Sequence, residues 1–159
     1  MRRLALAAAI VALLAVLAEE RATVAGFATA TDGDTLRLSG LSIRLAGIDA
    51  PELRQSCTRE EKPYPCGADA KAELARLAEG AVVRCRIEEE DRYGRSVAAC
   101  RAGGEDLGAA LVRRGFALSY ENRYRREEAD ARSAGIGLWS GSFTEPAQWR
   151  RENGIGYHP

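Results

Sequence analysis

Four cysteines follow an N-terminal segment that has the form of an export signal, and together they point to a fold linked by disulfides. Met1, Arg2 and Arg3 precede an uninterrupted run of small and apolar residues over 4–17, and Ala18 is followed by two glutamates. This arrangement is typical of a signal peptide over residues 1–18, with cleavage predicted after Ala18. The apolar run is short for a membrane span, and an uncleaved membrane anchor is the alternative.

Export to a secreted or periplasmic location would place the cysteines where thiols oxidise. Two disulfides are therefore expected, because a metal site would usually show Cys-x-x-Cys spacing, and four cysteines allow three pairings. Cys85 and Cys100 are equidistant from the turn-like run 91–94, so a hairpin there sets them opposite one another. This predicts the bridge Cys85–Cys100 and leaves Cys57 and Cys66 to close a second loop.

The pattern of apolar residues in the mature chain predicts short strands first and helices later. Turn residues separate β-prone segments over 24–31, 35–38 and 42–48, and a long irregular loop is predicted over 49–66. Helical spacing after Gly67 ends at Gly80, strands over 81–89 and 96–102 form the cysteine-linked hairpin, and further helices are predicted over 107–114 and 124–134. This order matches an α+β fold, a five-stranded OB-fold-type β-barrel with about three helices. We expect one domain over 19–159, with a C-terminal extension over 141–159.

Net charge gives no reason to expect a polyanionic partner. The chain has 23 basic and 23 acidic residues, and loss of Arg2 and Arg3 with the signal leaves 21 basic against 23 acidic. Any binding of nucleic acid must therefore depend on a local arrangement of arginines.

Acidic residues stand where a site that hydrolyses phosphodiester bonds could form. Such a site needs an activated water, a cation on the non-bridging oxygens and hydrogen-bond donors that follow the developing charge. Asp34 follows Asp-Gly, a common turn, and Asp49 begins Asp-Ala-Pro-Glu at the end of the third strand, which could be a cap or turn. The alternative is that strand ends bring Asp34 and Asp49 to one hard cation, and calcium suits such an open, flexible site.

Two arginines are candidate ligands of phosphate. Arg44 lies on the strand that leads to Asp49, and Arg95 follows the turn at Tyr93-Gly94. Singly, each could be a solvated surface arginine. Together with paired acids, the two guanidinium groups form the planar clamp that phosphate favours.

Five motifs occur in a defined order along the chain. They are D-G-D-T at 32–35, I-R-L-A-G-I-D-A-P-E at 43–52, D-R-Y-G-R at 91–95, L-V-R-R-G at 111–115 and G-L-W at 137–139. In this combination the chain closely resembles the thermonuclease family, also called micrococcal or staphylococcal nucleases, over residues 24–139. The resemblance implies the barrel fold, calcium dependence, and endonucleolytic cleavage of DNA and RNA that leaves 3′-phosphate ends.

The same resemblance implies a role for each acidic position. Asp34 and Asp49 become carboxylate ligands of Ca²⁺, and the main-chain oxygen of Ala50 becomes a further ligand. The family often has threonine at the position of Ala50, which should not matter if only the carbonyl coordinates. Glu52 becomes the group that orients or deprotonates the attacking water.

Arg44 and Arg95 become the ligands of the scissile phosphate by this resemblance, with Arg95 also stabilising the leaving side. A non-catalytic barrel of the same fold that binds nucleic acid or protein is the alternative. Such a module would be expected to have lost some of the five charged positions, and this chain retains them all. We therefore expect a calcium-dependent nuclease that acts on DNA, RNA or both as a monomer, without membrane association once the signal is removed.

Overall fold

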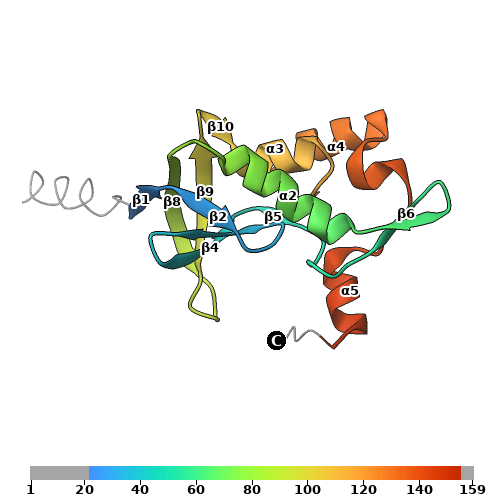
Figure 1. Cartoon of the computed structure of the whole chain (residues 1–159), viewed down its shortest axis with the longest axis horizontal. Helices are drawn as coiled ribbons and strands as arrows, with labels where there is room; N and C mark the ends of the chain where they lie inside the picture. Colours follow the sequence, from blue (N-terminus) through green and yellow to red (C-terminus); the bar gives the residue numbers. More distant parts are fainter. Residues whose placement is uncertain (1–21, 155–159) are drawn as a thin grey trace, which may run out of the picture.

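The computed structural model describes residues 22–154, so the predicted signal peptide lies outside the described residues. Most strands belong to one curled sheet with the order β1-β8-β9-β4-β3-β2, and β10 pairs with β9 outside this path (Figure 1). Its strands are β1 Thr23–Gly26, β2 Ala28–Ala30, β3 Thr35–Leu38, β4 Leu41–Leu45, β8 Val83–Glu90, β9 Ser96–Ala102 and β10 Glu105–Asp106.

The two ends of this sheet are consecutive parts of one bent strand. β1 pairs with β8 and β2 pairs with β3, and Phe27 lies at the bend between them. The pairing of β4 with β9 is parallel, whereas the other pairings in the sheet are antiparallel. Counting β1 and β2 as one strand gives a five-stranded barrel, so the predicted OB-fold-type architecture is confirmed.

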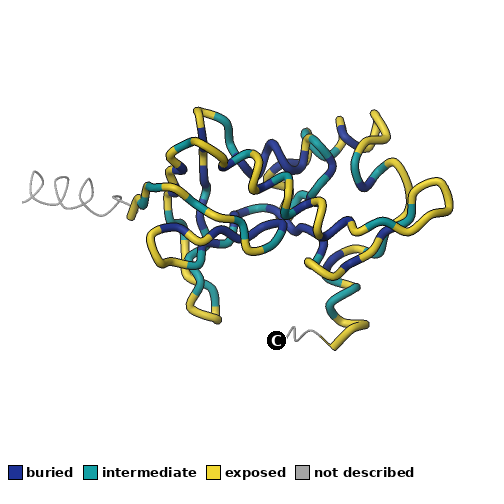
Figure 2. The backbone as a smooth tube through the Cα atoms, in the orientation of Figure 1, coloured by how far each residue is buried: buried dark blue, intermediate teal, exposed yellow. Residues whose placement is uncertain are grey.

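Apolar side chains of the strands and helices fill the barrel. Alternate residues of β3 and β4 point inward, so that Leu36, Leu38 and Ile43 are completely buried. The helices α2 Cys66–Ala78 and α3 Leu107–Arg113 pack against the sheet and add Leu74 and Leu111 to the same core. Figure 2 shows the buried segments running through the middle of the molecule.

Both predicted disulfides are present. Cys85 and Cys100 are register partners in β8 and β9, as the predicted hairpin requires. Cys57 is bonded to Cys66 at the beginning of α2. The second bridge therefore fixes the loop before α2 to the helix that covers the barrel.

The chain between the strands is more regular than predicted. The stretch predicted as an irregular loop contains a two-stranded sheet of β6 Cys57–Arg59 and β7 Lys62–Tyr64, and β5 Ile48–Asp49 pairs with β11 Leu118–Ser119. After α4 Arg125–Ala134, the 3-10 helix Gly137–Ser140 leads to α5 Pro146–Glu152, a helix that was not predicted. No helix within residues 22–154 has the length and apolar character needed to cross a membrane.

Candidate functional site

Three predicted site residues meet where β3, β4 and β5 lie together. Asp34 immediately precedes β3, Arg44 faces Thr35 across the β3–β4 pair, and Asp49 ends β5. The Arg44 Nη1 atom lies 2.8 Å from Asp34 Oδ2, and its Nη2 atom lies 3.2 Å from Asp49 Oδ1. One guanidinium group therefore bridges the two carboxylates, which the sequence places 15 residues apart.

The carboxyl group of Asp34 is the most perturbed group of the site. Its side chain is only 7% exposed, and it accepts hydrogen bonds from Thr35 Oγ1 at 3.0 Å and, at 3.5 Å, from the backbone N–H of Ala50. Burial raises the pKa of Asp34 to about 7, and the opposing effect of Arg44 is smaller. At neutral pH a carboxyl with this pKa is only partly ionised, and additional positive charge nearby would favour its ionised form.

Two glycines allow the acidic loops to approach α2 closely. A Cβ atom on Gly33 would lie 2.8 Å from the Cβ atoms of Ala50 and Ala70. A Cβ atom on Gly67 would overlap the carbonyl oxygen of Glu52. The positions of the Asp34 and Glu52 loops therefore depend on the absence of side chains at these glycines.

Glu52 is held by a buried amide that sequence reasoning did not identify. Gln55 is 1% exposed, and its Oε1 atom accepts a hydrogen bond of 3.2 Å from the backbone N–H of Glu52. The Gln55 backbone N–H donates to the Glu52 carbonyl at 2.7 Å, and its Nε2 atom donates to the carbonyl of Thr144 at 2.7 Å. Gln55 thus joins the Glu52 turn to the segment that precedes α5.

A third arginine, Arg150 of α5, was also missed. Its Nη1 atom lies 3.0 Å from Asp49 Oδ1 and 2.9 Å from Glu52 Oε1, and its Nη2 atom lies 3.0 Å from Asp49 Oδ2. Burial lowers the pKa of Arg150. Its hydrogen bonds and charge contacts with Asp49 and Glu52 together raise the pKa by a larger amount, so the guanidinium group stays charged. No local pattern in the sequence identifies this arginine as part of the site.

Arg95 follows the turn between β8 and β9 and has a different partner. Its Nε atom lies 2.7 Å from Asp91 Oδ2, and its backbone N–H donates to Asp91 Oδ1 at 3.0 Å. In the parallel pairing of β4 with β9, Arg44 is aligned with Val97. Arg95 immediately precedes β9, the strand that pairs with β4.

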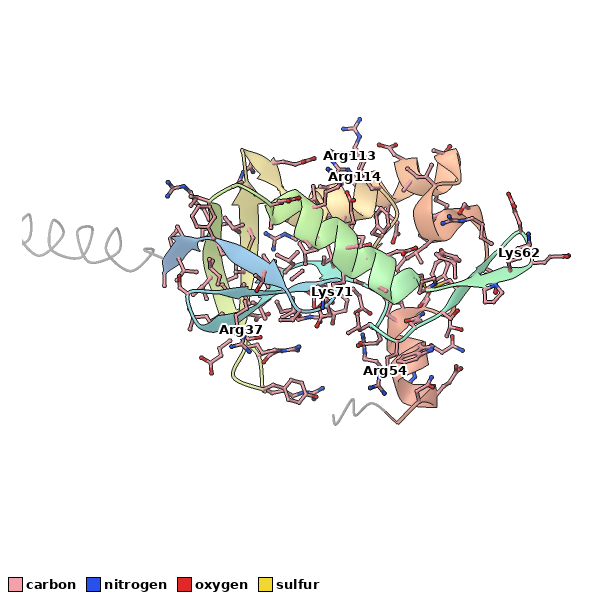
Figure 3. The ribbon with its side chains drawn as sticks, viewed as in Figure 1. Arg37, Arg54, Lys62, Lys71, Arg113 and Arg114 are labelled. Carbon is pink, nitrogen blue, oxygen red and sulfur yellow. A yellow bond between two sulfur atoms is a disulfide. The ribbon has the colours of Figure 1, made fainter. Side chains whose placement is uncertain are left out.

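The structure therefore brings together five of the six predicted site positions and pairs the sixth, Arg95, with Asp91. Those in contact, directly or through a shared arginine, are Asp34, Arg44, Asp49, Ala50 and Glu52. Other basic side chains are spread along the molecule, as the labelled ones in Figure 3 show. The two arginines of the site, Arg44 and Arg150, are both paired with its carboxylates.

Fold and site together define an OB-type barrel that carries paired acids and arginines beside its first three strands. The sequence model of the family described as "Staphylococcal nuclease homologue" matches residues 42–141. This match covers more than half of the chain, and the chain belongs to this family.

Several bacterial and plant proteins are similar to the chain. The "Succinoglycan biosynthesis protein ExoI" of Rhizobium meliloti (strain 1021) is 35% identical over 123 residues, which cover 73% of this chain and 64% of that protein. The "Staphylococcal-like nuclease CAN1" of Arabidopsis thaliana is 33% identical over 115 residues, 69% of this chain but 33% of the plant protein. An "Uncharacterized endonuclease" of Haemophilus influenzae is 32% identical over 136 residues, 79% of this chain and 71% of that protein. The chain thus spans less than two thirds of the first two relatives.

Proposed function

We propose that this chain is a calcium-dependent nuclease that cleaves DNA, RNA or both endonucleolytically and leaves 3′-phosphate ends. The observation that carries the proposal is the bridge from Arg44 to both Asp34 and Asp49, because it brings two carboxylates and a phosphate-binding group to one point. The family membership and the nuclease names of the plant and Haemophilus relatives support the same activity.

The available ligands fit calcium. Within residues 22–154, no group of three or more His, Cys, Asp or Glu side chains is arranged to hold a metal ion. We propose that a cation at this site is held by the two carboxylates of Asp34 and Asp49 and the carbonyl of Ala50, with water in the other positions. Calcium accepts such an open set of oxygen ligands. The raised pKa of Asp34 is consistent with a cation here, since added positive charge would favour the ionised form of this buried carboxyl.

The residues of the chain would supply the rest of the chemistry. Calcium, when bound, neutralises charge on the phosphate oxygens. Glu52 would accept a proton from a water beside the phosphate, and its partial exposure and fixed turn support this role. Arg44 would donate to the same phosphate, and Arg95, which immediately precedes β9, would stabilise charge on the leaving side.

Export and a monomeric domain belong to the same proposal. The two disulfides support a secreted or periplasmic location, because such bonds persist in oxidising compartments. We propose that a signal peptide over 1–18 is removed and that residues 19–159 act as one domain. N-terminal sequencing of exported protein and its mass in solution would test these points.

The deciding experiment incubates the mature protein with single-stranded and double-stranded DNA and RNA, in calcium or in excess chelator. We expect cleavage in calcium, less in magnesium because it demands tighter octahedral geometry, and none in chelator. Products should become substrates for polymerase extension only after a phosphatase removes their 3′-phosphates. The Asp49→Asn variant is the control for the metal site and should lose most activity. Full activity in chelator would contradict the proposal, and binding without cleavage would support a non-catalytic module.

A further inference from the structure

We propose that Arg150 is a positioning residue of the active site, so that helix α5 completes a site otherwise built on the barrel. The proposal rests on the proposed nuclease function. Arg150 lies beyond residues 42–141, the part of the chain that matches the family. It lies on α5, in the C-terminal segment of the chain.

The first observation is the geometry of the guanidinium group. Arg150 binds both oxygens of Asp49, each at 3.0 Å, and its Nη1 atom also binds Glu52 Oε1 at 2.9 Å. Two parallel hydrogen bonds to one carboxylate fix orientation as well as distance. The side chain of Arg150 is only 15% exposed, so solvent screens these ion pairs less than surface pairs.

The second observation is the charge balance around Glu52. Asp49 and Glu52 would repel each other if no cation lay between them. Arg44 pairs with Asp34 and Asp49, and among the described residues the ion pair of Glu52 is formed with Arg150. Arg150 therefore sets the Glu52 carboxylate relative to the metal ligand Asp49, which is the relation that water activation requires.

The third observation is that the chain holds α5 in place independently of Arg150. Ser142 and Thr58 exchange backbone hydrogen bonds of 2.9 Å in both directions, which attaches the segment to β6 beside the Cys57–Cys66 bridge. The Thr144 carbonyl accepts the hydrogen bond of Gln55, and α5 lies next to the loop between β5 and β6 (Figure 1). Arg150 is thus delivered to the acids by an anchored helix.

The test compares Arg150→Ala and Arg150→Lys with Arg151→Ala, a control on the same helix that removes an exposed arginine. We expect Arg150→Ala to lower kcat on DNA at saturating calcium by about 10–100-fold, as misplacement of a reacting group does. KM should change little, because binding of the substrate phosphate is assigned to other residues. Arg150→Lys should recover only part of the rate, since an ammonium group cannot form the two parallel hydrogen bonds. Arg151→Ala should behave like the parent.

A second measurement does not depend on nuclease activity. Hydrogen exchange at the Glu52–Gln55 turn in metal-free full-length protein should be faster in Arg150→Ala than in Arg151→Ala, with melting temperatures recorded for each. A parent-like kcat in Arg150→Ala would overturn the proposal. If Arg150→Ala had a parent-like kcat and reached it at a lower calcium concentration than the parent, Arg150 would be a competitor of the cation. Equal exchange in the two alanine variants would likewise overturn it. A parent that does not cleave in calcium would refute the nuclease function itself, and the exchange data would then report only the docking of α5.

Discussion

Replacing Asp34 with asparagine should change how the stability of the metal-free protein depends on pH. Burial raises the pKa of Asp34 from 3.8 to about 7, against the smaller effect of Arg44. A carboxyl whose pKa is higher in the folded state takes up a proton on folding. Its contribution to stability is therefore complete below pH 3.8 and is lost as the pH rises through 7. At 1.36 kcal/mol per pKa unit, the loss is about 4 kcal/mol.

Urea unfolding of the parent and Asp34→Asn in chelator, from pH 4 to 8, would measure this effect. The pKa values of Glu73 and Asp91 are lowered by hydrogen bonds to neighbouring arginines and, for Asp91, by backbone N–H groups as well, despite opposing burial. These acids give stability that rises with pH, but they are common to both proteins. The difference between the two unfolding free energies therefore isolates Asp34. In calcium the ionised carboxylate is favoured, so the added stability of the parent should grow as the pH rises.

A difference that stays constant from pH 4 to 8 would refute this reasoning. It would mean that Arg44 keeps Asp34 ionised throughout, and that burial is not the dominant influence on its pKa. A gain in stability from calcium that is equal in the parent and in Asp34→Asn would separately contradict the role of Asp34 as a ligand.

Three further outcomes are expected. Gln55→Ala removes buried hydrogen bonds to Glu52 and to the segment before α5, so urea unfolding should show a loss of about 2–3 kcal/mol, and kcat should also fall. Unchanged stability would contradict the anchoring role. Replacing Cys57 and Cys66 together with alanine should lower the unfolding free energy by about 2.5 kcal/mol, because it opens a short covalent loop, and an unchanged denaturation midpoint would argue against this. Arg95→Lys should lower kcat by about 10²–10³ with little change in melting temperature. Activity within a few-fold of the parent would show that Arg95 is a surface residue.

Local patterns in the sequence were sufficient for the barrel and for one disulfide. The turn between Cys85 and Cys100 brings β8 and β9 together, and the two cysteines are register partners as predicted. The pairing nearest the turn, Glu90 with Ser96, would alone place Cys85 opposite Arg101, and a bulge between Ile87 and Glu89 shifts the register by one residue. Asp34 and Asp49 could be singled out from the sequence because both lie at strand boundaries that turn residues mark. The pair β6–β7 was missed because Pro63 disfavours a strand, yet β7 is an edge strand, where a missing N–H is tolerated.

Contacts between distant segments could not be predicted in this way. Arg150 meets Asp49 across 101 residues, and Gln55 meets Thr144 across 89. Polar contacts of this kind have no period in the sequence, because they depend on where the completed fold places two surfaces. The first strand shows the same limit: the composition of 24–31 predicts a strand, but not its bend at Phe27.

The bent strand formed by β1 and β2 has a consequence for proteolysis at the N-terminal end of the domain. Residues 23–26 bond to β8 and residues 28–30 bond to β3, so this one segment covers an edge of each neighbour. Removing it would expose two strand edges at once, and free edges are templates for pairing with other chains. A protease that stops before Thr23 should leave a protein that stays dispersed in solution. One that cuts within the bent strand should convert the same barrel into an aggregating species.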